Sequence, residues 1–182
     1  MSGARSRSKV GKALVGVFRD LRTGWRYAWL TWFAGNPLMP RPGRWLVYRM
    51  FGFAIRTPNV SHSCVIVGRR LTIGPGTFVN KRCLFEAFGP IVVGAGCQLG
   101  IEVMILTSHH TMGPEGVSRQ ADYRGVTVGD RVWLASRVTV LPGVTIGSDV
   151  VVGAGAVVAK DLLEPGVYAG VPAKLVRAGL AG

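Results

Sequence analysis

The sequence has few acidic residues, few cysteines and no long hydrophobic run. Only 9 of its 182 residues are Asp or Glu against 22 Lys or Arg, so the formal net charge is +13. The three cysteines form no CxxC pair, which argues against a disulfide framework and gives little support to a zinc site. The N-terminal region lacks a signal-peptide core and any stretch near the roughly 20 apolar residues that span a bilayer. These absences predict a cytoplasmic protein with reduced thiols.

The positive charge is concentrated in residues 1–56. This segment holds 11 Lys or Arg and a single acid, Asp20, which gives a net charge of +10, and it contains four of the five tryptophans. Apolar residues recur every three or four positions up to residue 35, which predicts a helix, and a second short helix is expected near residues 44–53. This basic, aromatic extension either covers the domain that follows or lies against an anionic membrane at the inner membrane face.

Glycine is abundant, with 26 residues, and many glycines follow an aliphatic residue at a six-residue period. The series begins at Val67-Gly68 and continues, with two interruptions, to Val158-Ala159. Its fifth position holds small or β-branched residues. They are Thr77, Cys83, Cys97, Val103, Val132, Val138, Val144, Val150 and Ala156. One large and one small apolar residue per step predicts a stacked coil of short strands, in which both cysteines fill inward slots.

The six-residue period fails between Ile105 and Val128. The interruption, at about residues 107–125, contains two of the three histidines, His109 and His110. A polar segment extruded from a regular coil favours a functional role, because loops carry function more often than cores do. A histidine that titrates near neutral pH suits the removal of a proton from an attacking hydroxyl. The hexad phase places His109 in an inward slot and His110 pointing away, so His110 is the favoured base and His109 the alternative.

Several strings resemble the hexapeptide-repeat acyltransferases, in particular the maltose, galactoside and nodulation-type O-acetyltransferases and those of exopolysaccharide synthesis. They are residues 105–110 (ILTSHH), 126–134 (VTVGDRVWL), 141–147 (LPGVTIG), 152–161 (VGAGAVVAKD) and 170–174 (GVPAK). The resemblance covers residues 57–177. It implies an all-β fold, with a left-handed parallel β-helix over residues 57–182 behind the short helical extension. It also implies a homotrimer that transfers an acetyl group from acetyl-CoA to a hydroxyl of a sugar or other hydroxylated acceptor, without a metal.

The same resemblance implies roles for individual residues. His110 would be the catalytic base. Pantetheine would contact Ser136 and Ala154. The nucleotide end of coenzyme A would contact Ala159, Lys160, Lys174 and Arg177. The acceptor would contact Asn80, Glu86 and Trp133. Simpler structural roles stand beside these: a solvated surface for Lys160 and Arg177, backbone capping for Asn80 and core packing for Trp133.

Other functions fit the sequence less well. A zinc enzyme on the same fold needs three separated histidine ligands, whereas His109 and His110 are adjacent and only His62 remains. No nucleic-acid-binding motif accompanies the positive charge, so a nucleic-acid partner is not expected. The main alternative is a non-catalytic β-helix scaffold or membrane-surface module that works through its basic N-terminal arm.

Overall fold

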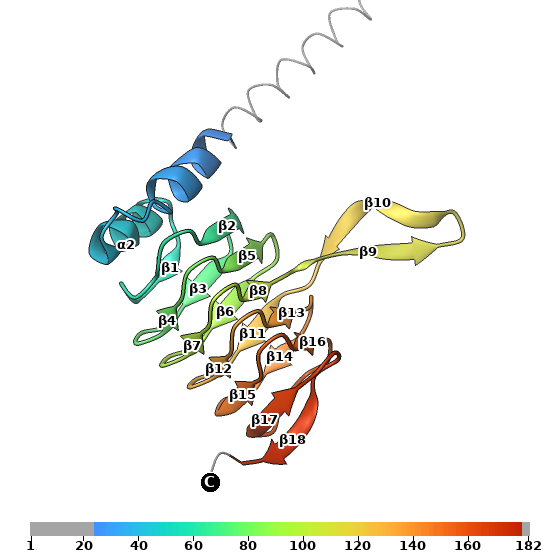
Figure 1. Cartoon of the computed structure of the whole chain (residues 1–182). Coiled ribbons are helices and arrows are strands. Elements are labelled where there is room, and N and C mark those ends of the chain that lie inside the picture. Colours follow the sequence, from blue (N-terminus) through green and yellow to red (C-terminus); the bar gives the residue numbers. More distant parts are fainter. Residues whose placement is uncertain (1–23, 180–182) are drawn as a thin grey trace, which may run out of the picture.

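A computed structural model describes residues 24–179 (Figure 1). Three parallel sheets, here called faces A, B and C, wrap around one core in about six turns, and each strand pairs with the equivalent strand of the neighbouring turn. The all-β, parallel β-helix expected from the six-residue period is therefore confirmed. Face A contains β1 (Ala54–Ile55), β3 (Leu71–Ile73), β6 (Ile91–Val93), β11 (Val126–Val128) and β14 (Thr145–Ile146).

Faces B and C complete the coil. Face B contains β4 (Phe78–Val79), β7 (Gln98–Leu99), β12 (Trp133–Leu134), β15 (Val150–Val152) and β17 (Gly166–Ala169), and the antiparallel β18 (Lys174–Ala178) ends it. Face C contains β2 (Val65–Gly68), β5 (Leu84–Ala87), β8 (Met104–Ile105), β13 (Thr139–Val140) and β16 (Val157–Val158). The chain therefore passes the same three corners, A to B, B to C and C to A, once in every turn.

The fifth-position residues line the interior, as predicted. All nine are at most 3% exposed. Several also donate a hydrogen bond to the next turn: the Cys83 thiol to the carbonyl oxygen of Gly100 at 3.2 Å, and the Cys97 thiol to that of Gly129 at 3.1 Å. Burial raises the pKa of the Cys97 thiol, which keeps it a protonated donor. Both cysteines thus have a packing role, as the repeat predicted.

At the B-to-C corner, the glycine that follows the aliphatic residue does not hold the left-handed turn position. That position is held by Arg82, Glu102, Arg137 and Gly155, with φ of 61°, 60°, 62° and 71°. Gly100, which follows an aliphatic residue, is required for another reason: a Cβ there would lie 2.5 Å from the Ser136 nitrogen of the next turn. The glycine period read from the sequence therefore reflects close stacking of successive corners.

The N-terminal segment closes the first turn of the coil. Residues 24–28 and η1 (Trp29–Phe33) are helical, and α2 (Arg41–Met50) follows. Leu30 and Ala34 are buried in the same core as the strands. Both helices predicted from the sequence are present in the described part of the chain, whereas the first 23 residues of the predicted helix lie outside it. The first strand, β1, already lies within residues 1–56.

A buried arginine joins this segment to the coil. Arg44 is only 2% exposed, and its guanidinium donates hydrogen bonds to four backbone carbonyls. The acceptors belong to Ala34, Asn36, Met39 and Val60, at 2.5–3.0 Å. Burial lowers the pKa of Arg44. These bonds connect three separate stretches of chain, so Arg44 fixes the cap on the end of the β-helix.

Large aromatic side chains remain on the outside of the cap. Trp25 is 66% exposed and Trp32 is 85% exposed. With Trp29 and Phe33 they border an apolar hollow of about 340 Å³. Among residues 24–179, no helix is long and apolar enough to cross a membrane.

Candidate active site

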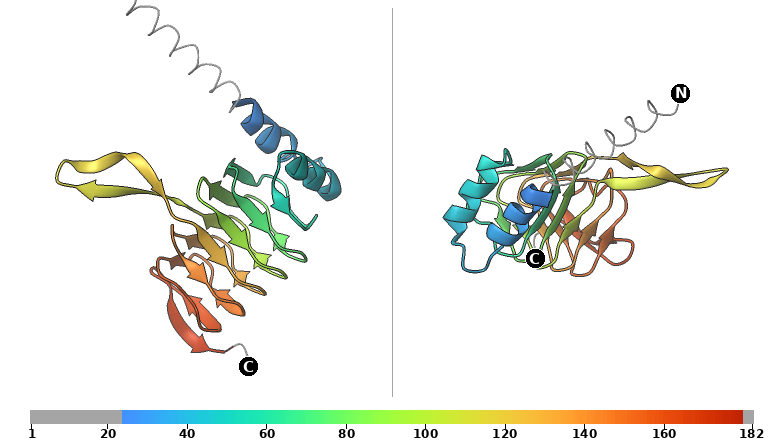
Figure 2. Two further views of the ribbon diagram at one scale, coloured as in Figure 1. Left: turned by 180° about the vertical axis from the view of Figure 1, so that it is seen from behind. Right: turned by 90° about the horizontal axis from the view of Figure 1, so that it is seen from above.

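The interruption of the repeat forms a β-hairpin that projects far from the β-helix (Figures 1 and 2). It consists of β9 (Ser108–Gly113) and β10 (Gly116–Tyr123) and leaves the coil at the C-to-A corner between β8 and β11. Both candidate histidines lie on β9, near the base of the hairpin, where His109 pairs with Asp122 and His110 with Ala121. The predicted loop at about residues 107–125 is thus an ordered two-stranded arm.

Thr107 and Glu86 fix the base of the hairpin. One carboxylate oxygen of Glu86, Oε2, accepts hydrogen bonds from the backbone amides of Thr107 at 3.1 Å and Ser108 at 3.0 Å. The fully buried Thr107 hydroxyl donates to the Glu86 carbonyl and accepts from the Gly89 amide. Glu86 therefore sets the direction in which the chain carries the histidines away from the coil.

His110 has an oriented ring. Its Nδ1 lies 2.8 Å from the backbone carbonyl oxygen of Ser118 on β10. A carbonyl only accepts hydrogen bonds, so Nδ1 must carry the proton, and Nε2 of the neutral ring keeps its lone pair. The residue is exposed. This arrangement gives His110 the tautomer and the accessibility of a general base. The hydrogen bond depends on the hairpin register, which the sequence does not reveal.

His109 has a different environment. It is half-buried, and within the described residues neither ring nitrogen has a hydrogen-bond partner, although both atoms are buried. The hexad phase predicted that His109 fills an inward slot of the coil. This prediction is wrong, because the chain leaves the coil at Ser108, one residue earlier. His109 instead lies on the hairpin.

The predicted acceptor residues do not gather in one place. Glu86 lies at the hairpin base, whereas Asn80 lies at the B-to-C corner, where its Oδ1 accepts from the Lys81 amide at 2.9 Å. Trp133 is 53% exposed on the outside of face B, between Gln98 and Val151 of the adjacent strands. Core packing of Trp133 is therefore excluded. In a three-sided coil, face B lies opposite the C-to-A corner that carries the histidines.

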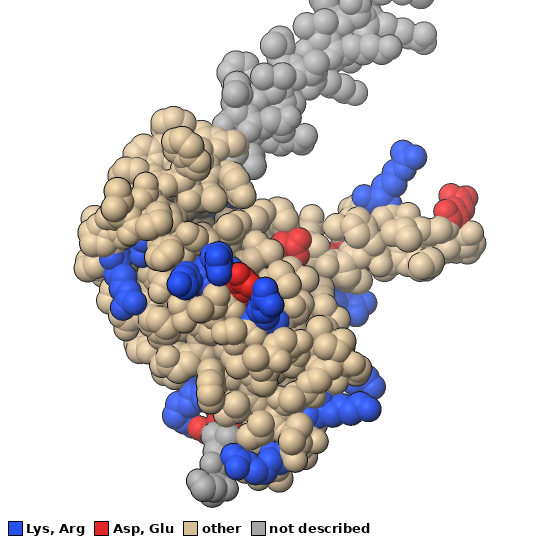
Figure 3. Space-filling view, viewed as in Figure 1, with Lys and Arg blue, Asp and Glu red and all other residues tan. Residues whose placement is uncertain are grey.

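The residues predicted to bind coenzyme A are also divided, between the B-to-C corner, the C-to-A corner and β18. Ser136 and Ala154 occupy equivalent positions of successive B-to-C corners, where the Gly155 amide donates to the Ser136 carbonyl at 2.9 Å. Ala159 and Lys160 follow β16 at the C-to-A corner, below the hairpin in the coil. Lys174 and Arg177 are exposed on β18. Figure 3 shows that basic side chains outnumber acidic ones on the face it presents, both across the middle of the β-helix and at its C-terminal end.

No cluster of three or more His, Cys, Asp or Glu side chains positioned for a metal ion occurs between residues 24 and 179. The oriented histidine has acid–base chemistry of its own, because a neutral imidazole that is held through one nitrogen accepts a proton at the other. An acceptor hydroxyl at hydrogen-bond distance from Nε2 would be activated as a nucleophile.

Comparison with known proteins shows what the chain is similar to. Residues 125–160 match the family described as bacterial transferase hexapeptide (six repeats). A galactoside O-acetyltransferase from Lactococcus lactis is 35% identical over 111 residues, which cover 60% of this chain and 54% of the relative. The chain spans between about half and two thirds of the length of the curated relatives it matches.

Solved structures share the fold over most of the chain. A maltose O-acetyltransferase from Clostridium difficile superposes with a TM-score of 0.74 at 26% identity, covering 88% of both chains. A hexapeptide-repeat acetyltransferase from Vibrio cholerae, solved with acetyl coenzyme A, superposes with a TM-score of 0.73 at 22% identity and covers 86% of both chains. The fold is therefore the left-handed β-helix that the sequence resemblance implied.

Proposed function

We propose that this chain is a member of the hexapeptide-repeat acyltransferase family and an acetyl-CoA-dependent O-acetyltransferase, a reading that its similarity to members of that family supports. The acceptor would be a hydroxyl of a sugar or another hydroxylated compound. The single observation that supports this function most strongly is the His110 ring, which is exposed, held at Nδ1 by the Ser118 carbonyl and therefore unprotonated at Nε2 when neutral.

The proposed reaction needs a base but no protein nucleophile. His110 Nε2 accepts the proton of the acceptor hydroxyl as its oxygen attacks the thioester carbon of acetyl-CoA, and the C–S bond breaks to release the coenzyme A thiolate as the ester forms. A positioned base of this kind typically contributes about 10²–10⁴ in rate. The Ser118 carbonyl then stabilises the imidazolium by keeping its hydrogen bond to Nδ1, and the proton passes from Nε2 to the leaving thiolate. His109 stays the alternative base.

The Glu86 carboxylate is the acceptor contact best supported by geometry. Its Oε2 accepts hydrogen bonds from two backbone amides, whereas within the described residues no protein group donates a hydrogen bond to Oε1. Oε1 could therefore accept a hydrogen bond from a second hydroxyl of a sugar close to the histidines. Asn80 and Trp133 would have to reach the same acceptor from a different part of the coil.

We infer that the complete site forms between copies of the chain in a homotrimer. The proposal is supported by the division of the predicted residues: histidines and Glu86 at the C-to-A corner, Ser136 and Ala154 at the B-to-C corner, and Trp133 on face B. Juxtaposing the hairpin of one copy with face B and the B-to-C corner of the next would bring the two groups together. The long projecting hairpin supplies an element that could reach across.

Coenzyme A would lie along the B-to-C corner of one copy. Backbone groups beside Ser136 and Ala154 suit the amides of pantetheine, and the exposed cations Lys160, Lys174 and Arg177 suit phosphates. Lys174 and Arg177 lie together on β18, whereas Lys160 lies at the C-to-A corner and would reach the nucleotide end from the neighbouring copy.

A mixing experiment tests the shared site. His110→Ala removes the base, and Ala154→Trp blocks the corner at an exposed position where the side chain can protrude. Each variant alone should lack acetyl transfer. If base and groove come from different copies, random mixed trimers of the two should recover about a quarter of the wild-type sites. Recovery below a few per cent, with mixed trimers demonstrated by mass, would place both parts in one copy.

A second candidate function uses the N-terminal segment. The exposed Trp25 and Trp32 beside an apolar hollow, together with the net charge of +10 over residues 1–56, fit a peripheral contact with an anionic membrane. Such a contact would place the protein at the cytoplasmic membrane face and would be compatible with catalysis as well as with a non-catalytic scaffold.

A further inference from the structure

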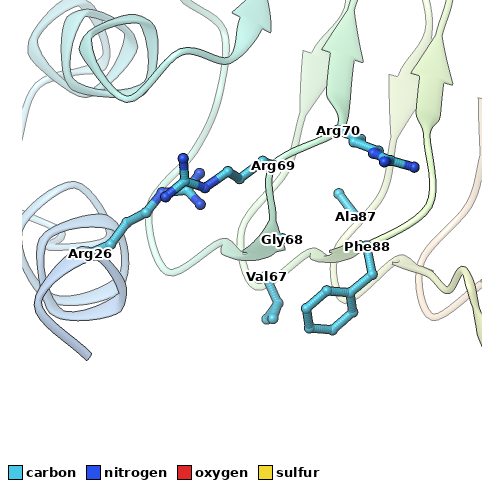
Figure 4. A pocket seen from close by; sticks show the side chains of 7 residues that line it. All are labelled: Arg26, Val67, Gly68, Arg69, Arg70, Ala87 and Phe88. Carbon is cyan, nitrogen blue, oxygen red and sulfur yellow. The ribbon is translucent and has the colours of Figure 1, made fainter. Parts of the chain in front are cut away.

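A basic pocket lies between the N-terminal helix and the first C-to-A corners of the coil (Figure 4). Its volume is about 370 Å³. Arg26 extends from the helix toward Arg69, which lies on the corner that follows β2, whereas the neighbouring Arg70 lines the pocket with its side chain directed away from these two. Val67 and Phe88 form its apolar wall. The pocket lining therefore contains an aromatic ring and three arginines, of which Arg26 and Arg69 face one another, and it contains no acidic residue.

The cations in this pocket are not neutralised by the described part of the protein. Arg26 and Arg69 extend toward one another in Figure 4, and burial together with the positive charge of Arg69 lowers the pKa of Arg26. The Arg26 Nη2 atom is buried and has no hydrogen-bond partner among residues 24–179. The ion pairs found in that range involve Arg82, Arg131 and Arg137 only. Holding like charges together around a buried donor is unfavourable unless an anion joins them.

The pocket is adjacent to the candidate active site. Val67, on its wall, pairs directly with Glu86, whose carboxylate holds the start of the hairpin. Phe88 packs against Tyr123 with ring centroids 5.5 Å apart, and Tyr123 pairs with Ser108, the residue before His109. A molecule bound in the pocket is thus only one strand away from Glu86 and from the base of the histidine-bearing strand.

We propose that this arginine pocket binds a phosphate or diphosphate group of the acceptor, so that the enzyme acetylates a phosphorylated glycosyl compound. The assignment of the ligand as the acceptor depends on the proposed acetyl transfer, whereas the anion site itself does not depend on it. The facing guanidiniums of Arg26 and Arg69 match a multiply charged phosphate better than a single carboxylate, because each can donate two parallel hydrogen bonds to its oxygens. Phe88 would pack beside the apolar part of the same acceptor.

A binding measurement tests the pocket without turnover. Inorganic pyrophosphate is titrated calorimetrically into the full-length protein and into Arg26→Gln, Arg69→Gln and the matched control Arg56→Gln. Arg56 is exposed at the end of β1, outside the pocket. Loss of one charge-assisted contact should weaken binding at least tenfold in the two pocket variants and leave the control unchanged. No binding, or equal affinity in all four proteins, would overturn the site.

A kinetic comparison tests the acceptor class. We expect kcat/KM of the wild type to be at least tenfold higher for a hexose monophosphate than for the same neutral hexose, and this ratio to fall toward one in Arg69→Gln. A ratio near one in the wild type would contradict acceptor selection by the pocket. Absence of transfer to every acceptor, with pyrophosphate binding intact, would instead reject the proposed acetyltransferase and retain the anion site.

The phosphate could belong to a soluble ester or to a lipid headgroup. Vesicles of phosphatidylcholine with phosphatidic acid should displace pyrophosphate in an Arg69-dependent manner if a lipid is the source. If only the soluble hexose monophosphate displaces pyrophosphate, the acceptor is a soluble ester. Failure of both to compete would contradict a phosphate-bearing acceptor.

Discussion

Replacing Arg44 should destabilise the cap more than any exposed arginine of the same segment does. In Arg44→Met the side chain keeps its approximate length, but four backbone carbonyls lose their donor. Two of them belong to the buried residues Ala34 and Val60 and cannot be rehydrated without opening the cap, whereas Asn36 and Met39 are more accessible. An unsatisfied buried acceptor costs about 1–3 kcal/mol. Removing the guanidinium also removes the cost of burying its charge, which offsets part of this penalty. The net decrease in the free energy of unfolding is about 3 kcal/mol.

Thermal and urea unfolding measure this loss. For a chain of this size, about 3 kcal/mol corresponds to a fall in Tm of about 6–12 °C. Tryptophan fluorescence reports the cap, because four of the five tryptophans lie in residues 1–56, while far-ultraviolet circular dichroism reports the coil. The matched control is Arg49→Met, an exposed arginine on the same helix whose guanidinium lies over the Trp45 ring. Equal Tm values for Arg44→Met and the control would refute the structural role of the buried guanidinium.

Three further predictions concern stability and location. Gly100→Ala should lower the free energy of unfolding in urea by about 1–3 kcal/mol, because its Cβ would clash with the next turn. Gly113→Ala, with open space around the new Cβ, should leave it unchanged. Equal losses in the two variants would refute the stacking argument. Hydrogen bonding to Arg137 lowers the pKa of Glu102, so its stabilising effect is present at neutral pH and lost as pH falls through the lowered pKa. The Tm difference between Glu102→Gln and wild type should therefore shrink on acidification, and a pH-independent difference would contradict this. Anionic vesicles should co-sediment with the full chain, and Trp32→Ser should weaken that binding without changing Tm; no binding by the full chain would make the segment a cap only.

A deletion that tests the role of the basic N-terminal segment must leave the buried core intact. Removing residues 1–35 would also remove Leu30 and Ala34, which are buried in the main core, and one carbonyl acceptor of Arg44. A deletion of residues 1–23 spares these contacts. Loss of vesicle binding on this shorter deletion, with unchanged Tm, would separate a membrane role from the structural role.

The repeat made much of the coil predictable from the sequence. A single rule, one large and one small inward residue per hexad, identified the strands and the buried slots, because each turn of the coil presents the same environment. The first strand was missed as part of the coil, since Ala54–Ile55 lies before the repeat becomes regular. The positive-φ residues at the corners, such as Arg82 and Glu102, were not predictable from residue type, because the stacked turns impose that conformation.

The candidate site was predictable only as far as the period could be counted. The interruption located the histidines, but the count failed for His109 because Thr107 and Glu86 redirect the chain at Ser108. The Ser118 contact of His110 depends on hairpin register. The arginine pocket joins Arg26 to residues more than forty positions later in the chain, and nothing local in the sequence signals such a contact.

The central claim is that His110 is the base of an acetyl transfer. The most direct measurement is acetyl-CoA consumption by His110→Ala, His109→Ala and wild type over a panel of sugars, amino sugars and sugar phosphates, with coenzyme A binding and circular dichroism as controls. We predict that wild type transfers acetyl to at least one acceptor and that His110→Ala loses about 10²–10⁴ in kcat while it still folds and binds coenzyme A. Full turnover by His110→Ala, or no turnover by wild type, would contradict the account.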